Sequence, residues 1–382
     1  MLYEMTDMRI DEIRIHRLEA PLTRRFGWSL NWTATRTATL VEVRTSDGLA
    51  GWGDGMWAEA RLRAHPELVL GRSPFDVEAI YDELRALPAA QSRRGDVACG
   101  GLDAALWDLY GKALDVPVWR LLGRKVRDRV QPYLTALYMQ DWADPARGLA
   151  EEALHWKSLG FCAMKMKVGY DPEKDARLVR AVRGAIGPGI SLGIDANCAY
   201  DSGTALRLCG QVEQFDPMWF EEPVLADDLD GYDRLRAGTR IPLAGGETAT
   251  LDTLVRDYVQ PRRVDVLQPE VEIIGLTGAK RLSYLCWLNR IRLAPHNWGT
   301  AVRTAAILHW MAVTPPLTEA LNGAPQLFEF DQTESPFRDA VIREKLAPEE
   351  DGLLAVPQSP GLGITVNPAE VARFRVEEIV LR

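Results

Sequence analysis

The sequence lacks the features that mark membrane proteins, nucleic-acid-binding proteins and thiolate metal sites. Only five of its 382 residues are cysteines and none forms a C-x-x-C pair, so thiolate zinc and thioredoxin-like chemistry are not expected. Positive charge is in deficit, and the net charge of −9 argues against nucleic acid or anionic membrane as a partner. No apolar run is long enough to span a bilayer, and residues 1–22 lack the apolar segment of a signal peptide. These absences favour a cytoplasmic protein with free thiols.

What the sequence does contain is the composition of a large globular protein with two kinds of region. Residues 1–127 begin with strand patterns and continue with helical ones, and we expect them to form an α+β domain. Within them, Gly51 to Gly55 is interpreted as a loop. Residues 128–352 alternate between strand and helix, which favours a parallel α/β barrel. The tail, residues 353–382, returns to short strand and turn signals, and we expect it to pack on the N-terminal domain.

Charged side chains end successive apolar runs in the barrel region at nearly regular distances. The intervals from Lys165 onward are 30, 26, 26, 23 and 26 residues, and the residues are Lys165 with Lys167, Asp195, Glu221, Glu247, Glu270 and His296. A strand, a helix and their connecting loops take about this many residues in a barrel of roughly 250 residues. Because catalytic groups of such barrels gather where the strands end, we expect these side chains to meet at one mouth.

Three of these residues are carboxylates that would repel one another at a shared mouth. Asp195, Glu221 and Glu247 each follow an apolar run. A cation that neutralises them would remove the repulsion. Oxygen ligands alone suit Mg²⁺, or Mn²⁺, better than zinc. The spacing therefore predicts a magnesium site.

The two lysines share one face of their strand, because residues at positions i and i+2 point the same way. Apolar residues occupy the alternate positions, so Lys165 and Lys167 are expected to face the inside of the barrel. Neighbouring ammonium groups lower each other's pKa, and a lysine with a lowered pKa can act as a general base. A solvated surface strand is the structural alternative.

A histidine and two glutamates complete the candidate site. His296 ends one apolar run and Glu270 ends the preceding one, so the carboxylate can orient the imidazole and raise its basicity. Glu329 follows Leu327 and Phe328 and is expected at the end of the last strand. Glu319 is the competing residue for that place, but its surroundings have weaker strand character.

Together these segments resemble the mandelate racemase subgroup of the enolase superfamily over nearly the whole chain. The similar motifs are Lys165-Met166-Lys167, Asp195-Ala196-Asn197, Glu221-Glu222-Pro223, Gly246-Glu247, residues 265–269, His296-Asn297-Trp298-Gly299, residues 104–112 and residues 360–363. The resemblance implies a modified (β/α)7β TIM barrel with an α+β capping domain, and Mg²⁺ bound by Asp195, Glu221 and Glu247. It also implies removal of the proton α to a carboxylate, and a homo-oligomer.

The resemblance leaves the reaction open. Our first interpretation is dehydration of an acid sugar or related hydroxy acid to a 2-keto acid, with a small carboxylic acid as the partner. A racemase or epimerase of a 2-hydroxy or amino acid derivative is the alternative, and a non-catalytic ligand-binding barrel is a third. The family usually has Asp where this chain has Glu270, and residues 266–271 lack the lysine that lactonizing enzymes and dipeptide epimerases use. Aromatic residues in two expected N-terminal loops, Phe26 to Trp32 and Trp52 to Trp57, are candidates for closing over a substrate.

Overall fold

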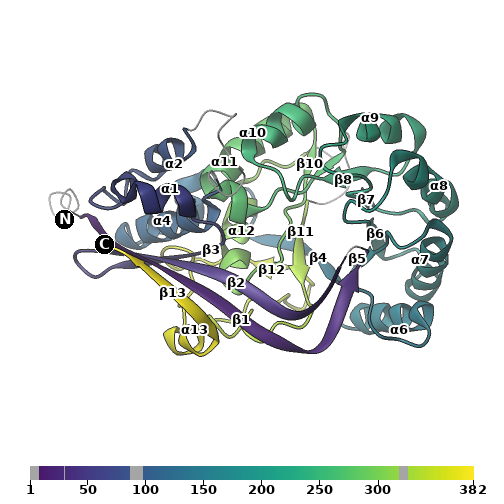
Figure 1. The fold of residues 1–382 in the computed structure, drawn as a ribbon, viewed down its shortest axis with the longest axis horizontal. Coiled ribbons are helices and arrows are strands. Elements are labelled where there is room, and N and C mark those ends of the chain that lie inside the picture. Colours follow the sequence, from purple (N-terminus) through teal and green to yellow (C-terminus); the bar gives the residue numbers. More distant parts are fainter. Residues whose placement is uncertain (1–7, 30, 87–97, 318–325) are drawn as a thin grey trace.

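The computed structural model describes residues 8–29, 31–86, 98–317 and 326–382. They form a parallel barrel and an α+β cap that lies against it (Figure 1). The barrel sheet follows the order β10-β9-β8-β7-β6-β5-β4-β11. Its strands are β4 (Arg129–Leu137), β5 (Ala163–Lys167), β6 (Ser191–Asp195), β7 (Phe220–Glu221), β8 (Leu243–Gly245), β9 (Val266–Leu267), β10 (Arg292–Leu293) and β11 (Leu327–Asp331). The predicted barrel with its cap is therefore confirmed.

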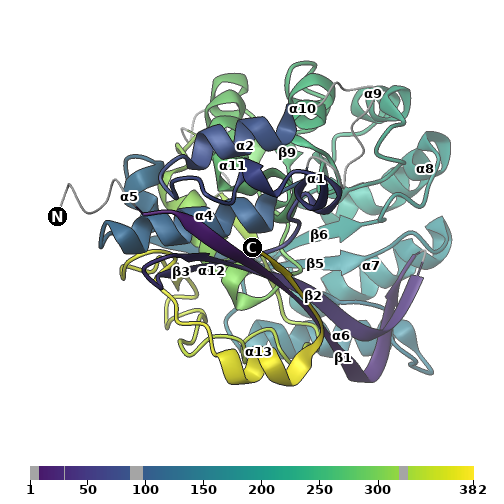
Figure 2. The ribbon, with the colours of Figure 1, turned by 60° about the vertical axis from the view of Figure 1, so that its left-hand side comes forward.

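Helices cover the outside of the barrel, as Figures 1 and 2 show for α6 to α9. They are α6 (Pro145–Ser158), α7 (Pro172–Ile186), α8 (Ser202–Val212), α9 (Leu229–Gly238), α10 (Leu251–Thr253), α11 (Val271–Asn289) and α12 (Ala301–Val313), with short 3-10 and π turns at Glu213–Phe215 and Leu254–Val259. The starts of α6 and α7 follow from an Asp-Pro pair. Asp144 and Asp171 accept hydrogen bonds from the first free backbone N–H groups, and the proline after each has none to lose.

The inside of the barrel is filled below the mouth. A buried cluster consists of Tyr133, Ala163, Trp219, Ala244, Val266, Ala294 and Leu327. Several of its members stand two residues before a candidate site residue, as Ala163 does before Lys165 and Trp219 before Glu221. Since residues i and i+2 of a strand share a face, the site residues form the next layer, at the C-terminal ends of the strands.

The barrel is nearly closed. Strand β11 pairs in parallel with β4, and on its other side the backbone N–H of Glu329 donates to the carbonyl oxygen of Pro295, 3.0 Å away. The short strand β12 (Leu354–Ala355) pairs with β4 in the antiparallel sense.

None of the helices that the structure describes is both long and apolar enough to cross a membrane.

The cap is built on a sheet with the order β13-β1-β2-β3. Its strands are β1 (Ile10–Trp28), β2 (Asn31–Thr45), β3 (Ala50–Asp54) and β13 (Arg375–Leu381), and its helices are α1 (Glu59–Ala64), α2 (Val77–Arg85), α4 (Gly100–Ala113), α5 (Val118–Leu122), α13 (Pro368–Phe374) and the 3-10 turn Pro66–Leu68. The C-terminal strand β13 thus pairs with the N-terminal strand β1. In Figure 1 the long ribbons of β1 and β2 extend from the cap along the barrel.

Two expectations about the cap are wrong. Gly51 to Gly55 is mostly strand β3, which lies so close to α4 that a Cβ on Gly53 would be 1.9 Å from the carbonyl oxygen of Gly101. The glycines permit this close packing rather than a loop. Phe26, Trp28 and Trp32 likewise lie within β1 and β2, because these strands continue as one long hairpin.

Candidate active site

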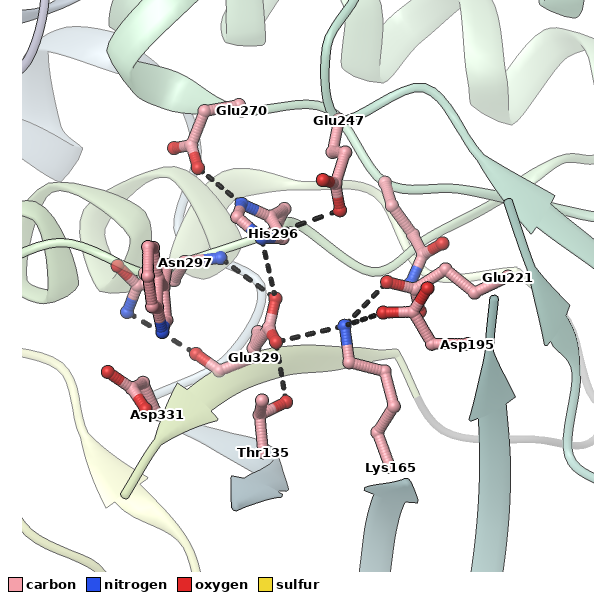
Figure 3. Close-up of polar contacts among 12 residues, drawn as sticks. Thr135, Lys165, Asp195, Glu221, Glu247, Glu270, His296, Asn297, Glu329 and Asp331 are labelled. Carbon is pink, nitrogen blue, oxygen red and sulfur yellow. Dashed lines mark hydrogen bonds and ion pairs between the residues drawn. The ribbon is translucent and has the colours of Figure 1, made fainter. Parts of the chain in front are cut away.

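Lys165 and Lys167 project from β5 into the mouth of the barrel, and both are buried against carboxylates. Nζ of Lys165 lies 2.5 Å from Oε1 of Glu221, 3.0 Å from Oε1 of Glu329 and 3.3 Å from Oδ2 of Asp195 (Figure 3). Nζ of Lys167 lies 2.5 Å from that same oxygen of Asp195. The prediction that the two lysines face the inside of the barrel agrees with this geometry, and the surface alternative does not.

The carboxylates reverse the expected shift of the lysine pKa values. Burial alone would lower the pKa of Lys167, but the negative charge of Asp195 outweighs it and raises the pKa above its ordinary range. Glu221 and Glu329 act in the same way on Lys165. The prediction of a lysine with a lowered pKa is therefore wrong for this arrangement, because it considered only the repulsion between the two ammonium groups.

The three candidate metal ligands come from neighbouring strands. Asp195 ends β6 and Glu221 ends β7, and Glu247 follows β8 by two residues. Oε2 of Glu221 accepts two hydrogen bonds. One comes from Nε1 of Trp219, 3.0 Å away, and the other from Nε2 of Gln268, 2.5 Å away. Glu247 is turned toward His296, with its Oε2 3.4 Å from Nε2 of the imidazole. Asp195 and Glu221 therefore share one cation, the ammonium group of Lys165, whereas Glu247 faces the imidazole of His296.

The residue types nevertheless fit a divalent cation. Within the described part of the chain, no three His, Cys, Asp or Glu side chains are arranged so that they could hold a metal ion as they stand. However, burial and the charge of Asp195 raise the pKa of Glu221 to about 8, which marks a site with more negative charge than its surroundings neutralise. Oε2 of Glu247 is also buried without a hydrogen-bond partner among the described residues. A cation bound by oxygen ligands would relieve both, provided that Glu247 turns from His296 toward Asp195 and Glu221.

His296 and Glu270 form a hydrogen-bonded pair on another side of the mouth. Nδ1 of His296 lies 2.5 Å from Oε2 of Glu270, and the two residues form a parallel bridge that extends β9 and β10 (Figure 3). Burial would lower the pKa of His296, but Glu247, Glu329 and Glu270 together raise it well above its ordinary value. The longer side chain of glutamate thus contacts Nδ1, as the usual aspartate is expected to do. The other ring nitrogen, Nε2, faces the mouth.

Glu329 lies on β11 between the lysines and the histidine. Oε1 accepts a hydrogen bond from the hydroxyl of Thr135, 2.5 Å away, and Oε2 accepts one from the backbone N–H of Asn297, 3.1 Å away. Burial opposes its charge, but Lys165 and His296 outweigh burial and lower the pKa of Glu329 to about 2. It is therefore an anion that holds both cations. The competing residue, Glu319, lies outside the described residues.

One buried ion pair behind the histidine is not evident from the sequence. Nη1 of Arg303, on α12, lies 3.3 Å from Oε2 of Glu270, and its Nη2 lies 2.7 Å from Oδ1 of Asp54 at the end of β3. Asp54 also accepts a hydrogen bond from the backbone N–H of Thr300, 2.6 Å away. The cap thus contacts the histidine through Asp54, Arg303 and Glu270. No spacing rule connects residues 54 and 303, although an Asp between two glycines is a cue for a loop or a tight contact.

A cavity of about 550 Å³ opens beside the site. Its barrel side includes Glu247, Glu270 and His296, and its cap side includes Thr37, Thr39, Met56 and Trp57. Phe26 and Trp28 of β1 lie farther along the mouth, with ring centroids 6.4 Å and 6.0 Å from that of Trp298. Trp32 is instead 40% exposed, and Trp52 stacks on His16 at 5.4 Å. Of the residues expected to close over a substrate, Phe26, Trp28, Met56 and Trp57 therefore lie near the site, whereas Trp32 and Trp52 do not.

Comparison with known proteins agrees with this architecture. Residues 148–371 match the family model described as enolase C-terminal domain-like, and residues 12–123 match the mandelate racemase / muconate lactonizing enzyme N-terminal domain. The chain belongs to the mandelate racemase and muconate lactonizing enzyme family of the enolase superfamily. The resemblance seen in the sequence motifs is thus confirmed.

The similar proteins within this enolase-superfamily group carry names of two kinds. The chain is 36% identical over 378 residues to the D-galactarolactone cycloisomerase of Agrobacterium fabrum, with 97% of this chain and 100% of the relative covered. It is 29% identical over 339 residues to the arabinonate dehydratase of Saccharolobus solfataricus, covering 86% and 87%. The crystal structure of the 3,6-anhydro-D-galactonate cycloisomerase from Zobellia galactanivorans superimposes with a TM-score of 0.85 at 34% identity, covering 97% and 100%.

Proposed function

We propose that this protein removes the proton α to the carboxylate of a sugar acid and expels an oxygen substituent from the β carbon. The observation that carries the proposal is the arrangement of two basic groups around one cluster of carboxylates. Lys167 on β5 and His296 after β10 are separated by four barrel strands on one side and two on the other. They therefore approach a molecule in the mouth from different directions. The names of the relatives reported above support the same chemistry.

Asp195, Glu221 and Glu247 are proposed to hold Mg²⁺, or Mn²⁺, because all their donor atoms are carboxylate oxygens. When bound, the cation would supply the positive charge that stabilises the substrate carboxylate as its α-proton leaves. Lys165 would add a hydrogen bond from its ammonium group to the same substrate oxygens. Buried charge near the reacting carbon acts strongly, since little water is present to screen it.

Lys167 and the pair formed by His296 and Glu270 are proposed to move protons. Lys167 can accept a proton only when the charge of Asp195 is directed elsewhere, because that carboxylate is what raises the lysine pKa. His296 presents Nε2 to the mouth while Glu270 fixes the proton on Nδ1. One group takes the α-proton and the other protonates the leaving oxygen. Glu329 is an anion that keeps Lys165 and His296 in place.

The nature of the leaving oxygen decides the class of enzyme. If the β oxygen is a free hydroxyl, water leaves, the enol becomes a 2-keto acid, and the enzyme is a dehydratase. If the β oxygen belongs to a ring, the ring opens, the product keeps that oxygen, and the enzyme is an isomerase. Dehydration remains the first proposal. Ring opening is the second, and it is favoured by the relatives with 36% and 34% identity, which are named cycloisomerases.

The test is incubation in D2O with Mg²⁺ and a panel of aldonates, their lactones and their anhydro forms, followed by proton NMR and a 2-keto acid assay. Elimination predicts loss of the α-proton signal together with a 2-keto product. Exchange with inversion and no keto product would instead support the racemase alternative. Binding without any exchange would support the non-catalytic barrel. A homo-oligomer and a cytoplasmic location stay predictions.

A further inference from the structure

The charges that line the cavity beside His296, and the partners they already have, bear on the kind of acid that the cavity accepts. This inference rests on the proposed function, since it takes the cavity to be the binding site of a sugar acid. The charged groups among the described residues that line it are, besides His296, the carboxylates of Glu59, Glu247, Glu270 and Glu272 and the guanidinium groups of Arg17 and Arg303. With Glu247 assigned to a cation, the carboxylates of Glu59, Glu270 and Glu272 are matched by Arg17, Arg303 and the imidazolium of His296, so the lining has no excess of positive charge.

Both arginines already have carboxylate partners. Arg303 is buried and contacts Asp54, Glu270 and Glu272. Its charge is thus taken up by three anions.

Arg17, on the cap side, has two partners. Its Nη2 lies 2.8 Å from Oε2 of Glu59, and its Nη1 lies 2.9 Å from Oε2 of Glu377. Glu59 also contacts Arg63 of its own helix, which adds one cation behind the cavity wall. Among the described residues, Arg17, Arg63 and Arg303 therefore each already have at least one carboxylate partner. A second substrate carboxylate placed there would therefore meet repulsion, and it would have to displace an existing partner of Arg17.

The remaining lining groups suit an uncharged, hydroxylated molecule. Thr37, Thr39 and Thr248 bring hydroxyl groups, each of which both donates and accepts a hydrogen bond. Trp57 and Trp298 bring aromatic rings, which pack against the C–H faces of a sugar. These groups recognise hydroxyl and ring oxygens without requiring charge.

We infer that the substrate carries a single carboxylate, bound at the Lys165 end of the mouth, and that the part reaching toward Glu59 and Glu272 is neutral. Aldonates and their cyclic forms belong to this class. Open-chain aldarates, which carry a carboxylate at each end, do not.

The experiment compares matched acids that differ only at the far end of the chain. Sodium D-galactonate and galactarate, D-gluconate and D-glucarate, and D-mannonate and D-mannarate are titrated into the Mg²⁺-loaded protein by calorimetry, and α-proton exchange is measured for each. The monoacid of at least one pair should bind more tightly than its diacid, by about tenfold or more, because of the like-charge repulsion. A diacid that binds or exchanges better than its monoacid in every responding pair would overturn the inference and leave the proposed function standing.

Two variants test the charges themselves. Glu59→Gln, on the exposed rim, and Glu272→Gln, deeper in the cavity, should each narrow the preference for the monoacid. Glu151→Gln, on an exposed part of α6, should leave the ratio unchanged. A ratio that none of the three variants alters would contradict the assignment. If no acid of either kind binds or exchanges, it is the proposed function that fails.

Discussion

At the scale of single residues, the proposed chemistry depends on groups whose properties are set by their neighbours. Lys167 is an ordinary lysine in the sequence, but in the barrel its only charge-bearing contact below 3 Å among the described residues is with Asp195. The residue type could be predicted from the K-x-K pattern, whereas the sign of its pKa shift could not. That sign depends on which carboxylates reach it, above all Asp195 from β6, and no spacing along the chain contains this information.

Replacing Lys167 with Ala should lower α-proton exchange by about 10²-fold to 10⁴-fold, the usual contribution of a general acid or base. The measurement is the initial rate of deuterium incorporation in D2O. Because the change leaves Asp195 with one cation fewer, the melting temperature should be followed as well. Lys345→Ala, on the exposed surface, serves as the control. Unchanged exchange in a folded Lys167→Ala protein would show that Lys167 is not the group that takes the α-proton.

Glu270→Gln tests the carboxylate behind the imidazole. Glu270 is one of three anions that raise the pKa of His296, so its neutralisation should lower that pKa. The limb of the pH–rate profile that reports His296 should move to lower pH, and kcat should fall by about 10²-fold. Glu270→Asp keeps the charge and should move the limb less. If the limb stays at the wild-type pH in both variants, Glu270 does not contribute to the pKa of His296.

At the scale of elements, the sequence predicts the barrel better than the cap. Asp-Pro pairs mark the starts of α6 and α7, and charged residues mark the ends of β5 and β6, because these signals are local. Strand β3 was missed because its glycines serve a contact with α4 that only the tertiary structure reveals. The same strand carries Asp54, so the missed element is also the one that connects the cap with the hydrogen-bonded pair of His296 and Glu270.

Asp54→Asn should weaken this connection without breaking the fold. The amide keeps an oxygen for the N–H of Thr300 but loses the charge that holds Arg303. Arg303 would then be held less firmly, and so would Glu270, which it contacts. The imidazole would be oriented less well, so kcat should fall between about 10-fold and 100-fold while KM changes little. The His296 limb of the pH profile should move as well. A lower melting temperature with an unchanged kcat would indicate that Asp54 is only structural.

At the scale of the whole molecule, the convergence of distant residues is what the sequence predicts most usefully. The regular intervals from Lys165 to His296 place one residue at the end of each strand, and the barrel brings them together because its parallel strands end at one rim. What the intervals do not give is the conformation of each side chain. Glu247 follows the right strand, yet it faces His296 rather than Asp195 and Glu221.

Metal binding should depend on pH through Glu221. Its pKa is raised to about 8, so below that value a bound proton competes with the cation. The apparent affinity for Mg²⁺ should rise with pH, by up to about tenfold per unit, and level off above pH 8. Calorimetry between about pH 6 and pH 9 measures this directly. An affinity independent of pH would contradict the role of Glu221.

Mg²⁺ at 100 times its Kd should also stabilise the fold by about 2.7 kcal/mol, and EDTA should remove that gain.

The most direct measurement is a crystal structure of the protein with Mg²⁺ and a sugar acid. We predict one ion in contact with oxygens of Asp195, Glu221 and Glu247 at about 2.1 Å, with Glu247 turned away from His296 and the acid between Lys167 and His296. An ion bound elsewhere, or an acid bound with those three carboxylates still apart, would contradict it.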